Sequence, residues 1–167
     1  MARIGFGGGG GPAARTSATG ASAMPWRHPA PADLLGYGGL IPFLGLALLS
    51  ALGLDWATRS ATYYGAAILS FLGAVHWGVA LRALDDEADL DPWRLGLGIL
   101  PSLVAWAALS LLGPTPAAAG AIALGILATN AVEALGGARG AVASSWLRLR
   151  WRLSLGAALS LGILATF

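Results

Sequence analysis

The chain has no cysteine, no lysine and few charged residues of any kind. The absence of cysteine excludes disulfide bonds, thiol catalysis, iron–sulfur clusters and cysteine zinc sites. Only 11% of the 167 residues are charged and 56% are hydrophobic, whereas a soluble domain usually carries about 25% charged residues. So few charges cannot cover a water-facing surface, and the composition therefore predicts a membrane protein.

Five apolar segments follow one another after residue 33. A helix needs about 20 apolar residues to cross about 30 Å of hydrocarbon. The sequence therefore predicts an all-α fold, an integral membrane bundle of five transmembrane helices, with spans at about 34–54, 61–81, 93–112, 116–135 and 149–167. The fifth span is short. It crosses if Arg150 and Arg152 extend to the headgroups, and a tilted or re-entrant segment is the alternative.

Residues 1–32 differ in composition from the predicted five-helix domain at 33–167. A glycine run from Gly7 to Gly11 and four prolines break any helix in this stretch. Such a composition cannot bury enough apolar surface to order itself, which indicates a disordered tail. Arginine, serine and alanine without an acidic residue also fit an organelle transit peptide.

The arginines are distributed unevenly about the predicted spans. All ten basic residues are arginine, and nine fall on one side of the five spans, with Arg59 the exception. Positive residues concentrate in cytoplasmic loops, so the pattern places the N-terminus in the cytoplasm or matrix and the C-terminus outside. The expected location is a bacterial inner (cytoplasmic) membrane, or the mitochondrial inner membrane in a eukaryote.

Polar and helix-breaking residues are rare within the spans, and the orientation assigns each one a depth. At 1.5 Å per residue, His76 and Asn130 lie roughly 8 Å from the inner ends of their spans. Pro42 and Pro101 are predicted helix kinks, because proline removes a backbone hydrogen bond. These positions converge on one layer of the inner leaflet, which holds Pro42, His76, Pro101, Ser102 and Asn130, with Glu133 nearer the inner surface.

This layer yields the candidate ligand-binding residues, which are His76, Trp77, Ser102, Asn130 and Glu133. Each also has a structural interpretation. His76 is either a packing histidine or a group that contacts a ligand or carries a proton. Glu133 is either a functional carboxylate or one half of an interfacial ion pair with Arg82, Arg94 or Arg148.

No catalytic motif or metal site is recognisable in the sequence. The acidic run from Asp85 to Asp91 lacks the spacing and the turn glycine of an EF-hand, and His28 is the only other histidine that could join His76 at a metal. We therefore predict no catalytic residue, no metal and no cofactor. The arginines lie beside apolar segments rather than in a solvated patch, which argues against nucleic-acid binding. The expected partners are the lipid bilayer, through headgroup contacts at Arg148, Arg150 and Arg152, and other membrane protein subunits.

Several stretches together resemble one family, which is typified by transmembrane protein sixty-nine and is a domain of unknown function in bacteria and mitochondria. The resemblance covers about residues 31–165, and its most specific part is the stretch that ends in Val75-His76-Trp77-Gly78. Similar stretches lie at 31–43, 100–106 and 146–150. The resemblance implies a five-helix inner-membrane protein, and it implies no activity and no catalytic residues.

The sequence favours a non-enzymatic accessory or assembly role, because catalytic constellations are lacking and the spans are rich in glycine. The alternative is a binder or carrier of a small amphipathic molecule such as a quinone, lipid or weak acid, held in an inner-leaflet pocket. A membrane enzyme is a third and weaker hypothesis, since acids and bases are sparse within the spans.

Overall fold

The computed structural model describes residues 30–85, 92–137 and 144–166. The predictions for the N-terminal tail, apart from its last three residues, and for the acidic run after Asp85 lie outside these residues. The described part of the chain contains six helices and no strand: α1 (Ala30–Gly38), α2 (Ile41–Ala51), α3 (Asp55–Asp85), α4 (Pro92–Leu112), α5 (Pro116–Gly137) and α6 (Ser144–Leu164).

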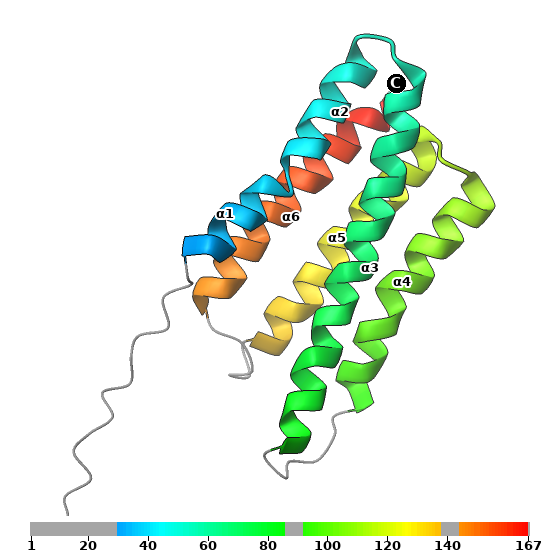
Figure 1. Ribbon diagram of the computed structural model, residues 1–167. Helices are drawn as coiled ribbons and strands as arrows, with labels where there is room; N and C mark the ends of the chain where they lie inside the picture. Colours follow the sequence, from blue (N-terminus) through cyan, green and yellow to red (C-terminus); the bar gives the residue numbers. More distant parts are fainter. Residues whose placement is uncertain (1–29, 86–91, 138–143, 167) are drawn as a thin grey trace, which may run out of the picture.

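The helices pack side by side into an elongated bundle (Figure 1). The α3 and α5 helices run in one direction, and α4 and α6 run in the other. The end of α3, the start of α4, the end of α5 and the start of α6 therefore meet at the same end of the bundle. Within the described residues, three segments are long and apolar enough to cross a membrane, Asp33–Ala51, Leu95–Leu112 and Pro116–Leu135. The predicted all-α membrane bundle is thus confirmed as a fold class.

The first predicted span is not one helix but two. The α1 and α2 helices are separated by Gly39 and Leu40, and Pro42 lies in the first turn of α2. At that position the missing N–H of proline would have no partner in any helix. Tyr64 of α3 donates its hydroxyl to the Gly39 carbonyl at 3.0 Å, which satisfies a backbone oxygen at the break.

The helices α3 and α6 are longer than predicted. The α3 helix begins at Asp55, six residues before the expected start, and extends over 31 residues. The α6 helix begins at Ser144 and has 21 residues, which corresponds to about 31 Å at 1.5 Å per residue. The α6 helix, which corresponds to the fifth predicted span, is therefore long enough to cross the hydrocarbon when its arginine-bearing first turns are included.

Small residues form much of the bundle core, which lets the helices approach closely. Alanines from α3 to α6 are buried around a few large side chains, chiefly Phe43, Leu69, Ile122, Ile126 and Leu161. The Phe43 ring lies 4.8 Å from the Tyr64 ring, centroid to centroid. Buried hydroxyls such as those of Thr62, Thr129 and Ser160 each donate to the carbonyl four residues earlier in their own helix. These three hydroxyls are therefore satisfied within their own helices.

Candidate functional site

An ion pair lies inside the bundle between α5 and α6. The Nε atom of Arg150 is 2.8 Å from Oε2 of Glu133, and the two residues are only 4% and 5% exposed. Trp146 lies one turn before Arg150 on α6, and its ring centroid is 5.9 Å from Cζ of the guanidinium. Each charge is costly to bury alone, and the pairing offsets part of that cost.

Asn130 extends this ion pair by one turn of α5. It is 0% exposed, and neither Nδ2 nor Oδ1 has a hydrogen-bond partner in the described part of the chain. The same holds for Nη2 of Arg150. A buried polar group that is left unsatisfied costs about 1–3 kcal/mol. Asn130, Glu133 and Arg150, which we call the buried polar cluster, thus retain capacity for further hydrogen bonds.

His76 lies at the level of the buried polar cluster, on the side of α3 that faces α5. Leu69 of α3 reaches within 2.8 Å of the Cβ position of Gly125 on α5. Seven residues make almost two helical turns, so His76 has nearly the angular position of Leu69. Because α3 and α5 run in the same direction (Figure 1), the same step along α5 reaches the turn that holds Asn130 and Glu133. His76 is 7% exposed, as expected for this interior position.

The structure corrects two predictions about the charged residues. Glu133 pairs with Arg150, which was not among the expected partners Arg82, Arg94 and Arg148. Arg150 was expected at lipid headgroups, yet it is buried, whereas Arg148 and Arg152 are exposed. The three arginines near the start of α6 thus differ in direction, because residues two apart lie on opposite sides of a helix.

Trp77 and Pro101 belong to a different contact, between α3 and α4. The indole Nε1 of Trp77 donates to the Leu95 carbonyl at 3.2 Å, and its ring lies directly over Gly98, where a Cβ would overlap it. A Cβ at Gly73 would lie 2.5 Å from the Gly98 carbonyl oxygen. Gly73, Trp77, Gly98 and Pro101 form what we call the α3–α4 interface, and their geometry indicates a packing role.

The predicted inner-leaflet layer therefore does not form one common space. Trp77 and Pro101 make their contacts in the α3–α4 interface, and Ser102, next to Pro101, is half-buried on α4. Pro42 precedes Phe43, which packs on Tyr64, and Tyr64 is about 18 Å along α3 from His76 at 1.5 Å per residue. Among the candidates, only His76, Asn130 and Glu133 share one level of the α3–α5–α6 interior.

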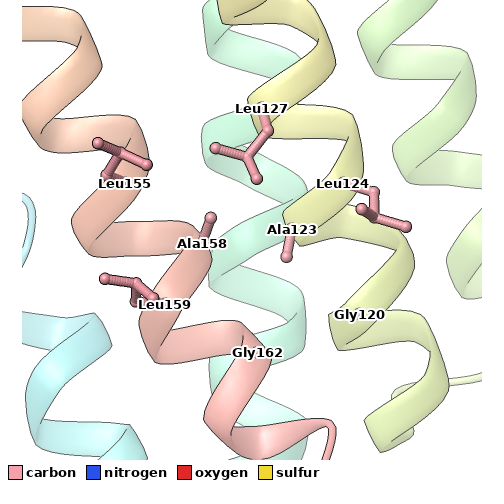
Figure 2. Close-up of a pocket in the computed structure, with 8 residues that line it drawn as sticks. All are labelled: Gly120, Ala123, Leu124, Leu127, Leu155, Ala158, Leu159 and Gly162. Carbon is pink, nitrogen blue, oxygen red and sulfur yellow. The ribbon is translucent and has the colours of Figure 1, made fainter.

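A separate apolar groove lies between α5 and α6, and none of its lining residues belongs to the buried polar cluster. Its volume is about 360 Å³, and its lining consists of glycine, alanine and leucine: Gly120, Ala123, Leu124, Leu127, Leu155, Ala158, Leu159 and Gly162. Figure 2 shows these residues on the two sides of the groove. In the described residues, no group of three or more histidine, aspartate or glutamate side chains could hold a metal ion.

Comparison with known proteins identifies the family. Residues 28–166 match the model of the family described as "protein of unknown function (DUF3429)". The chain belongs to the DUF3429 family. The DUF3429 match includes all six helices and therefore both the buried polar cluster and the α3–α4 interface.

A named relative gives the DUF3429 match a membrane context. The chain is 42% identical over 84 residues to "Transmembrane protein 69" of Xenopus tropicalis, over 48% of this chain and 33% of that protein. The match thus spans about a third of the relative's length. No solved structure matches the chain. These findings confirm the resemblance seen in the sequence and, with the apolar helices, identify a membrane protein.

Proposed function

We propose that this protein spans the inner membrane of bacteria or mitochondria five times and has a non-enzymatic accessory or assembly role. The N-terminus lies in the cytoplasm or matrix and the C-terminus outside. The helix arrangement supports this topology, because the ends of α3 and α5 and the starts of α4 and α6 lie at one end of the bundle (Figure 1). Arg82, Arg94 and the three arginines of α6 belong to these helix ends, and Arg59 belongs to the opposite end of α3.

One observation carries the non-enzymatic proposal. Glu133 is the only acidic residue inside the five predicted spans, whereas Asp33 and Asp55 lie just outside them. Its carboxylate pairs with Arg150. General acid–base catalysis needs a group that can exchange protons with a substrate. A buried carboxylate that is neutralised by a guanidinium is better suited to holding α5 against α6.

Site-specific photo-crosslinking in the native membrane tests the accessory role. A photoreactive residue is placed at Leu103 or Trp106, which are exposed on α4, and, as an internal control, at the buried Ala105. We expect the exposed positions to form a recurrent crosslink to one other membrane protein and the buried position to form none. Crosslinks to lipid alone at every exposed position would contradict the accessory role.

The topology has a test of its own. A reporter that is active only outside the membrane is fused after Phe167, and a second one replaces the loop between α3 and α4. The proposal expects activity from the first fusion and none from the second. The reverse pattern would overturn the orientation, and activity from both or neither would overturn the number of spans.

A second candidate function is the binding of a small amphipathic molecule, such as a quinone, lipid or weak acid. The amide of Asn130, which has no hydrogen-bond partner among the described residues, favours it, because a ligand carbonyl or hydroxyl would satisfy that amide. The test compares the small molecules that co-purify with wild type and with Asn130→Leu, which keeps the side-chain volume similar. Loss of one compound in the variant supports binding, and identical extracts contradict it.

Unchanged function in the His76→Ala, Glu133→Gln double variant would remove the weaker alternative, a membrane enzyme.

A further inference from the structure

The apolar groove between α5 and α6 continues along α6 into two exposed arginines. On α6, the groove is lined by Leu155, Leu159 and Gly162. Steps of three or four residues keep side chains on one face of a helix. Counting back from Leu155 by three and then by four residues reaches Arg152 and Arg148. Both arginines are exposed, and they therefore lie on the same face as the groove, toward the start of α6.

The distances along the helix fit a single elongated occupant. Arg152 is about 4.5 Å and Arg148 about 10 Å from the level of Leu155, at 1.5 Å per residue. An arginine side chain within a span can extend along the membrane normal, which brings its guanidinium to the headgroups. Neither arginine has an ion-pair partner in the described part of the chain, where Arg150 is the arginine that pairs with Glu133.

We propose that this face of α5 and α6 binds an anionic phospholipid. One acyl chain lies in the groove, and the phosphate of the headgroup is bound by Arg152 and Arg148. Guanidinium groups bind phosphate oxygens with two parallel hydrogen bonds. The groove contributes van der Waals contact for the acyl chain, since its glycines and alanines leave room between Leu124, Leu127, Leu155 and Leu159.

The charge at one end of the groove favours a lipid over a transmembrane helix of another protein. An apolar helix would fill the groove but would leave both arginines without an anion. A phospholipid satisfies both parts, because its anionic group and its acyl chain are joined in the same order as the arginines and the groove. The site also differs from the buried polar cluster, because Arg150 lies on the opposite side of α6 and is occupied by Glu133.

The test measures lipid binding to the purified full-length chain by native mass spectrometry. The probes are phosphatidylglycerol and phosphatidylcholine with the same acyl chains. The Arg148→Gln, Arg152→Gln variant should bind phosphatidylglycerol about 30-fold more weakly, because each arginine near an anionic surface contributes about 1 kcal/mol and each 1.4 kcal/mol is a factor of about ten. Its binding of phosphatidylcholine should not change. Arg59→Gln, which removes one exposed arginine at the far end of α3, is the control and should bind both lipids as wild type does.

A second variant tests the groove. Gly162→Leu adds a side chain where no atom lies within 4 Å of the Cβ position, so it should fill the groove without disturbing the fold. It should weaken the binding of both lipids. Gly45→Leu on α2, where the space around the Cβ is equally open, should not. The proposal is overturned if the double arginine variant keeps wild-type preference for phosphatidylglycerol, or if Gly162→Leu binds as tightly as Gly45→Leu. It is also overturned if a protein subunit occupies the groove and displaces lipid.

Discussion

The α3–α4 interface and the buried polar cluster between α5 and α6 hold helices together by different means. In the α3–α4 interface, glycine allows close approach, and the Trp77 ring covers Gly98. Between α5 and α6, a charge pair is enclosed, and Asn130 beside it has unused hydrogen-bonding groups. The α3–α4 interface depends on complementary shape, and its contacts are complete once the two helices pack. The buried polar cluster depends on charge. Among the described residues, the amide of Asn130 lacks a hydrogen-bond partner, which makes this cluster the better candidate for a ligand.

The largest expected loss of stability comes from replacing the paired Arg150 rather than the exposed Arg148. Arg150→Met leaves Glu133 as a buried charge without its partner, and breaking a buried pair in this way costs about 3–5 kcal/mol. Arg148→Met is the matched control, because Arg148 is exposed on the same helix, and it should change stability little. The free energy of unfolding in detergent micelles is the measurement. Equal losses in the two variants would show that burial of Arg150 is unimportant.

The next effect tests the α3–α4 interface. Gly73→Ala places a methyl group 2.5 Å from the backbone oxygen of Gly98, which cannot move without its helix. Overpacking of this kind costs about 1–3 kcal/mol. Gly78→Ala on the same helix has no atom within 4 Å of its Cβ position and should gain a little from helix propensity. If thermal unfolding shows the two variants to be equally stable, α3 and α4 are not in close contact at Gly73.

The smallest effect concerns the hydrogen bond that crosses the α3–α4 interface. Trp77→Phe removes the donor to the Leu95 carbonyl and keeps an aromatic ring over Gly98. Hydrogen bonds between membrane helices contribute about 0.6 kcal/mol on average, so the loss should be of that size. Trp106→Phe, a change on the exposed side of α4, serves as its control. A loss at Trp77 as large as that of Arg150→Met would mean that the α3–α4 interface depends on polar contacts after all.

The starts of α4 and α5 were predictable from the local sequence. The prolines Pro92 and Pro116 stand at the starts of α4 and α5, as their fixed φ and missing N–H favour. The break between α1 and α2 was missed, although Pro42 was recognised as a helix-disrupting residue. Pro42 lies in the first turn of α2, and the Gly39 carbonyl at the break accepts a hydrogen bond from Tyr64, 25 residues away. Local sequence does not identify such a partner.

The sequence analysis assigned the candidate residues a depth along their spans, but it did not assign the side of the helix on which each one lies. Position along each span predicts one depth for His76 and Asn130, with Glu133 nearer the inner surface, and Glu133 lies one turn beyond Asn130 on α5. The side of a helix on which a residue lies follows from the spacing of the buried residues along that helix. On α6 the sequence shows this spacing. Arg150 is followed at steps of four, three and four residues by Ser154, Ala157 and Leu161, all buried. This spacing indicates one inward face that includes Arg150, whereas Arg148 and Arg152 lie outside it.

A double-mutant cycle on Glu133 and Arg150 tests the central claim most directly, namely that α5 and α6 are joined by a buried ion pair. The unfolding free energy is measured for wild type, Glu133→Leu, Arg150→Met and the double variant. Replacing a buried pair with apolar residues is often neutral, so the double variant should be about as stable as wild type and more stable than either single variant. Because the double variant loses little, the coupling energy should then nearly equal the sum of the losses of the two single variants. Additive losses, with the double variant the least stable of the four, would contradict the account.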